Sequence, residues 1–148
     1  MKEVRKWTSL AALSGMGEDR PSALMISLVI RARFCEALAA LVGQQAKALD
    51  LFLMGLLSMV DTVLERPLSE ILQQLAISDE VKTALLSGGN QMRQILDLVV
   101  ATEKGQWPRM SFLASALKIA ENSVTEAYLQ AIQWSHQVFD IDQTALSA

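Results

Sequence analysis

Two arginines interrupt an otherwise apolar stretch in the first third of the chain, and they are the residues best placed for ionic chemistry. Arg31 and Arg33 lie within Ile30–Glu36, and Glu36 follows Arg33 by three positions. In a helix this spacing brings two side chains onto one face, so Arg33 and Glu36 can pair. A buried arginine needs a partner, because an unpaired buried charge is costly. We expect an ionic staple to a neighbouring helix, with partner docking and anion binding as alternatives.

Few other residues could support catalysis. The sequence has one histidine, His136, and one cysteine, Cys35, whereas a zinc site usually takes several such ligands. No Gly-x-Ser-x-Gly nucleophile motif occurs, and Gly88-Gly89 lacks the Lys-Ser/Thr of a phosphate-binding loop. We interpret His136 as a surface or helix-end residue, Cys35 as a buried structural thiol and the paired glycines as the end of a helix.

The carboxylates offer no better site. Asp50 and Asp61 bracket an apolar run and would share a helix face. At 1.5 Å per residue they stand about 16 Å apart. Paired catalytic carboxylates lie roughly 5–9.5 Å apart. We interpret both as the hydrated ends of a core helix, and we expect no catalytic residue, cofactor or metal.

Charge and hydropathy argue against several classes of partner. The 148 residues have a net charge of −3, and 51% are hydrophobic. Nucleic-acid binding draws most of its affinity from neutralised phosphates, and no basic stripe is present for it. The same argument disfavours an anionic membrane surface. The longest apolar run, Leu51–Val60, has about half of the roughly 20 residues that a membrane helix needs. We expect neither nucleic-acid binding nor membrane insertion.

Cysteine usage and the first residues bear on the compartment. A single cysteine excludes an internal disulfide and is typical of a reducing environment. Met1–Leu10 is charged and lacks the continuous apolar core of a signal peptide. We therefore predict a cytoplasmic protein.

Helix signals occur throughout the sequence, whereas strand signals are missing. Ser78-Asp79-Glu80 has the pattern of an N-cap followed by first-turn acids, and Gly43 and Gly105 are placed to end helices. We predict a compact all-α bundle of seven to eight helices, forming one domain over residues 1–139 with a frayed tail over 140–148. The predicted helices are Lys2–Leu13, Pro21–Val42, Lys47–Leu64, Leu68–Leu75, Ser78 to Gly88, Gln91–Lys104, Arg109–Ile119 and Val124–Phe139.

Three tryptophans, Trp7, Trp107 and Trp134, each sit among apolar residues. Basic residues are sparse around them, which disfavours a platform for stacking bases. We predict that all three are core anchors.

Short sequence blocks along most of the chain fit one family in order and spacing. They include Arg20–Leu24, Ile30–Glu36, Leu51–Ser58, Arg66–Leu72, Leu75–Leu86 and Glu103-x-Gly105-x-Trp107. Together they resemble the central and later part of bacterial HDOD domains, especially those fused to EAL domains. The resemblance runs from about Val4 to Trp134 and implies an HD-domain-like helical fold.

The resemblance also implies the loss of a metal site. HDOD domains are similar to HD phosphohydrolases, in which a His-Asp pair after a Gly-Leu-Leu stretch binds metal. Here Gly55-Leu56-Leu57 is followed by Ser58 and Met59. A hydroxyl and a thioether are poor ligands for the hard divalent ions of that chemistry. Ser58 and Met59 therefore mark a degenerate dyad position, and the resemblance implies no metal there.

The chain begins inside the HDOD pattern, at Met1–Val4. The resemblance therefore implies that the N-terminal helices of a full HDOD domain are missing from it. Those helices would cover part of the apolar surface, so we expect a homodimer through the face that they leave open.

Taken together, these patterns predict a protein that is not an enzyme. We expect a regulatory protein-interaction module of a bacterial signal transduction protein, linked to cyclic-di-GMP signalling through an EAL domain outside this chain. The sequence does not identify the protein partner. Two alternatives stay open: a metal-dependent nucleotide phosphohydrolase of the HD type, and a small-ligand sensor with Arg31 and Arg33 lining its pocket.

Overall fold

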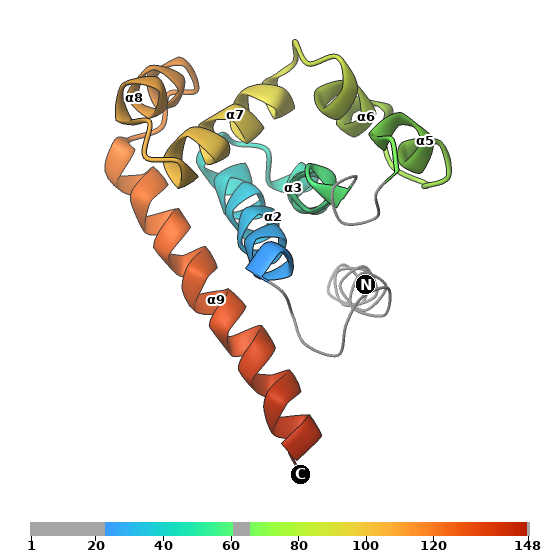
Figure 1. Cartoon of the computed structure of the whole chain (residues 1–148). Helices are drawn as coiled ribbons and strands as arrows, with labels where there is room; N and C mark the ends of the chain where they lie inside the picture. Colours follow the sequence, from blue (N-terminus) through green and yellow to red (C-terminus); the bar gives the residue numbers. More distant parts are fainter. Residues whose placement is uncertain (1–22, 61–65, 148) are drawn as a thin grey trace.

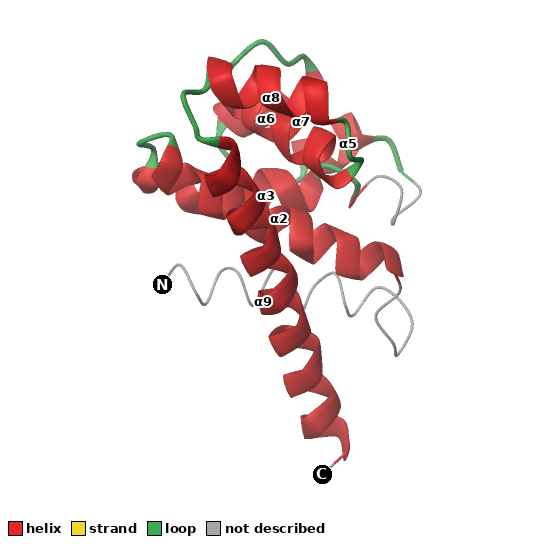
Figure 2. Cartoon of the chain, turned by 90° about the vertical axis from the view of Figure 1, so that its left-hand side faces the viewer, coloured by secondary structure: helices red, strands yellow, loops and turns green. Residues whose placement is uncertain are grey.

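The computed structural model describes residues 23–60 and 66–147, with side chains described as far as residue 138. Within these ranges the chain forms seven α-helices and one 3₁₀ turn, and it contains no strand (Figures 1 and 2). The predicted all-α class is confirmed. The predicted helix Lys2–Leu13, together with Trp7 and Asp61, lies outside the described residues.

Prolines, glycines and short polar stretches separate the helices, as the sequence predicts. The elements are α2 (Ala23–Leu41), the 3₁₀ turn η1 (Gln45–Lys47), α3 (Ala48–Leu57), α5 (Leu68–Gln73), α6 (Asp79–Leu86), α7 (Gln91–Glu103), α8 (Trp107–Ala116) and α9 (Glu121–Ser147). Gly43 follows α2 with a φ of 74°, and Gly105 follows α7 with a φ of 68°. Glycine adopts this left-handed conformation at little cost, so both predicted helix ends are confirmed.

Polar caps start the two helices in the middle of the chain. The Ser78 hydroxyl accepts a hydrogen bond from the backbone N–H of Val81 at 3.2 Å, and this cap begins α6. The side-chain oxygen of Asn90 accepts one from the backbone N–H of Arg93 at 3.0 Å, and this cap begins α7. Each cap satisfies a backbone donor that has no partner within its helix.

Two predicted helix ends were wrong. The helix predicted over Lys47–Leu64 does not continue through Ser58, because α3 ends at Leu57, where Ser58 forms the C-cap and its hydroxyl donates to the carbonyl oxygen of Gly55 at 2.7 Å. Leu64 itself lies outside the described residues. The last helix was predicted to end at Phe139 but continues to Ser147. The sequence after Phe139 contains neither glycine nor proline, the residues that most often stop a helix.

Helix α2 lies at the centre of the bundle and contacts α3, α7 and α9 (Figure 1). Helix α8 packs on α7 and α9, and α6 packs on α3 and α7. Cys35 is fully buried in α2, as the sequence predicts. No described helix is long and apolar enough to cross a bilayer. The largest fully buried side chains include Phe34, Phe52, Leu28, Leu38, Leu51, Met54, Leu56, Leu72, Ile95 and Leu98.

The crossing of α2 and α3 depends on a glycine. A Cβ atom added at Gly55 would lie 2.8 Å from the Cα of Ala32 and 2.9 Å from the carbonyl oxygen of Arg31. Because these are backbone atoms, a larger residue would push the two helices apart. The close approach at Gly55 therefore holds the end of α3 against the turn of α2 that carries Arg31.

Candidate functional site

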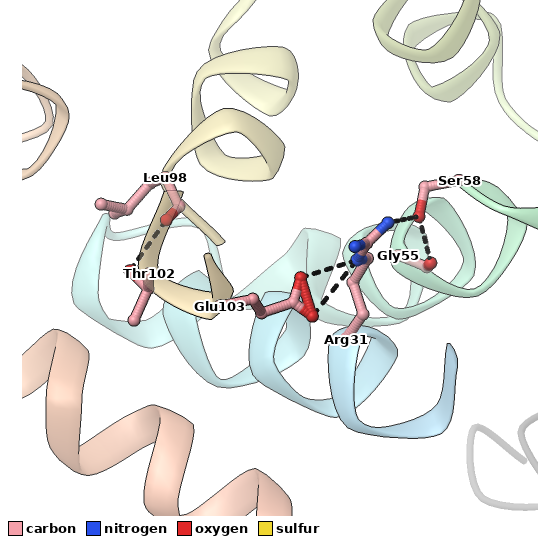
Figure 3. Close-up of polar contacts among 6 residues, drawn as sticks. All are labelled: Arg31, Gly55, Ser58, Leu98, Thr102 and Glu103. Atoms are coloured by element: carbon pink, nitrogen blue, oxygen red, sulfur yellow. Dashed lines mark hydrogen bonds and ion pairs between the residues drawn. The ribbon is translucent and has the colours of Figure 1, made fainter. Parts of the chain in front are cut away.

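The side chain of Arg31 joins three helices (Figure 3). Its Nε donates to Oε1 of Glu103, the last residue of α7, at 2.9 Å, and Oε2 lies 3.4 Å away. Its Nη1 donates to Oγ of Ser58, the C-cap of α3, at 3.2 Å. The side chains of Arg31 and Glu103 are only 13% and 15% exposed. We refer to Arg31, Glu103 and Ser58 as the ionic junction.

The hydroxyl of Ser58 connects the ionic junction to the backbone of α3. It accepts from Arg31 and donates to the carbonyl oxygen of Gly55. On the other side, Thr102 precedes Glu103 and donates its buried hydroxyl to the carbonyl oxygen of Leu98 at 2.8 Å (Figure 3). Hydrogen bonds therefore fix both helix ends that meet Arg31, and the buried polar groups have partners.

Burial sets the electrostatics of the ionic junction. It raises the pKa of the Glu103 carboxyl, and the guanidinium of Arg31 opposes that shift. Burial also raises the pKa of the Cys35 thiol, and the charge of Glu103 adds to this effect. The pKa of Tyr128 is raised by burial and then by Glu103. The Glu103 carboxylate thus acts on its neighbours as a partly buried negative charge that Arg31 compensates.

Arg33 has different surroundings, although one residue separates it from Arg31. It forms an ion pair with Glu36 on its own helix, and its guanidinium carbon lies 5.6 Å from the ring centroid of Trp134 in α9. The ring of Trp134 in turn meets that of Phe52 edge-on, with centroids 6.2 Å apart. Arg33 therefore joins α2 to α9, and the two arginines do not face one common site.

The structure brings only some of the residues singled out from sequence together. Ser58 meets Arg31, whereas Met59 is partly buried and packs against the core. His136 is exposed on α9, as predicted. Sequence reasoning missed Glu103 as the partner of Arg31, because the two are 72 positions apart and no local spacing relates them.

The three tryptophans do not share one environment. Trp134 packs against the core as predicted. The prediction for Trp107 was wrong, since its side chain is 56% exposed. Trp107 is the first residue of α8, and it lies beyond the buried stripe of Met110, Leu113 and Ala114 that holds the helix in place.

The residues at the dyad position do not fit a divalent metal. Ser58 contributes a neutral hydroxyl that already has two hydrogen-bond partners, one of them a guanidinium cation. Within residues 23–60 and 66–147, no group of three or more His, Cys, Asp or Glu side chains is arranged to hold a metal ion. The positive charge beside Ser58 is therefore the guanidinium of Arg31, at the position where the resemblance to HD enzymes would place a metal ion.

A shallow groove of about 220 Å³ lies between α2 and α9. Its lining residues are Ala37, Leu41, Ser123, Glu126, Ala127 and Gln130. Neither Arg31 nor Arg33 lines it, so the groove does not correspond to the ligand pocket expected as an alternative from sequence.

The described part of the chain is thus an all-helical bundle in which a partly buried arginine and glutamate compensate each other's charge. The chain is 35% identical over 141 residues to the uncharacterized protein YuxH of Bacillus subtilis. The alignment covers 93% of this chain and 34% of YuxH. The chain is 27% identical over 136 residues to the cyclic di-GMP phosphodiesterase CdgJ of Vibrio cholerae, covering 92% of this chain and 32% of CdgJ. The chain spans about a third of the length of these curated relatives. No family model and no solved structure matches it.

Proposed function

We propose that the chain is a non-catalytic regulatory module of the HDOD type, which binds a protein partner within a bacterial cyclic-di-GMP signalling protein. One observation carries the proposal. Ser58 stands where the resemblance to HD enzymes places a metal-binding histidine, and its hydroxyl is held by the guanidinium of Arg31. Glu103 neutralises that guanidinium from a third helix.

Electrostatic repulsion from Arg31 supports the proposal that no metal ion binds at Ser58. A monovalent and a divalent cation 4 Å apart repel by roughly 8 kcal/mol at an effective dielectric constant of about 20. A metal at Ser58 would therefore have to displace Arg31, and that would leave the partly buried carboxylate of Glu103 without its partner. The arrangement favours a stable helical scaffold over a metal-dependent hydrolase.

Similarity to CdgJ supports the signalling context, because that relative is by name a cyclic di-GMP phosphodiesterase. The matched region is about a third of CdgJ. In our proposal the present chain contributes the regulatory part of such a protein, presenting helical faces to a partner and relaying the state of an EAL domain outside this chain.

Metal analysis combined with a phosphodiesterase assay tests the non-catalytic assignment. The purified chain is incubated with Mn²⁺ or Mg²⁺, and bound metal and hydrolysis of cyclic di-GMP are measured. We expect substoichiometric metal and no turnover. Stoichiometric metal together with turnover that is lost in the Asp61→Ala variant would overturn the proposal.

Affinity capture tests the interaction role. This chain alone and a longer protein in which it is joined to an EAL domain are immobilised in parallel, and the proteins retained by each are identified. We expect a partner of the longer protein to be retained by this chain alone. If every partner requires segments outside the chain, the module is not the interaction site.

A further inference from the structure

We draw no further inference here: the strongest candidate, the surface patch on helix α8 that holds the exposed side chains of Trp107 and Phe112, carries nothing because the described part of the chain does not show what covers it, and the nearby cation Arg109 already has the carboxylate of Asp97 beside it.

Discussion

The ionic junction and helix α8 use charge and apolar area in opposite ways. At the junction, Arg31 is partly buried, and its guanidinium is held by Glu103 and Ser58. On α8, Arg109 and Phe112 face solvent, and the side chains that hold the helix lie on its other face. The junction ties helices together inside the molecule, whereas α8 leaves two aromatic side chains in solvent.

This difference separates residues that maintain the fold from residues that can change without harming it. Substitutions at the junction should lower the free energy of unfolding, because they leave buried charges or backbone clashes uncompensated. Substitutions on the outer face of α8 should leave that free energy nearly unchanged.

The largest contrast is expected between two phenylalanines. Phe34 of α2 is fully buried and stacks on Tyr128, with ring centroids 5.1 Å apart. Phe34→Ala should lower the free energy of unfolding by about 3–5 kcal/mol through lost burial and a new cavity. Phe112→Ala should change it by less than about 0.5 kcal/mol. Urea denaturation measures both, and equal effects would contradict the distinction between the two regions.

Removing Arg31 should have the next largest effect. Arg31→Met keeps most of the side-chain volume but leaves the partly buried Glu103 carboxylate without its cation, which should cost about 3 kcal/mol at neutral pH. The matched control is Arg66→Met, which breaks an exposed ion pair with Glu70 and should cost about 0.5 kcal/mol or less. Chemical denaturation of both variants shows whether the ionic junction stabilises the fold.

Gly55→Ala should have an intermediate effect. The added methyl group would clash with the backbone of Ala32 and Arg31, which should cost about 2–3 kcal/mol. The better helix propensity of alanine returns about 1 kcal/mol. We therefore expect a net loss of about 1–2 kcal/mol in thermal or urea unfolding. The same type of small change on α8, Ser115→Ala, should not be destabilising, and a destabilisation as large as that of Gly55→Ala would argue against a special role for the crossing.

The smallest effect concerns pH. Burial raises the pKa of Glu103 in the folded state, so the folded chain takes up this proton at a higher pH than the unfolded chain does. The resulting stabilisation is complete below the unfolded pKa and is lost as the pH rises through the folded pKa. The intact chain should thus gain stability relative to Glu103→Gln as the pH falls from 7 towards 4.5. Urea denaturation across this range measures the difference, and an opposite trend would contradict the sign of the shift.

Local signals in the sequence predicted much of the fold. Spacing of apolar residues, the Ser78 cap and the glycines after α2 and α7 correctly indicated helices and most of their ends. These features act within a few residues, so they can be read without the tertiary structure. The early end of α3 was missed, because it depends on the side-chain bond of Ser58 to Gly55 and not on a proline or glycine stop.

The candidate site was less predictable, because its contacts join distant parts of the chain. The spacing of Arg33 and Glu36 suggested a local pair, but nothing in the sequence related Arg31 to Glu103. The exposure of Trp107 was also missed. Apolar neighbours in the sequence indicate that a residue can be buried, but they do not indicate whether its end of the helix extends past the core. Both the contact between Arg31 and Glu103 and the exposure of Trp107 depend on how the helices cross and on which residues face each other there.

Because Cys35 is buried, the rate at which its thiol reacts can be used to measure how often the bundle opens. The thiol is shielded from solvent at the crossing of α2 and α3, and burial raises its pKa. A maleimide or disulfide reagent can reach the sulfur only when these helices separate, because the reactive form is the solvated thiolate. The rate of labelling therefore reports how often the centre of the molecule opens, and it can be measured in native buffer without a denaturant or an engineered labelling site.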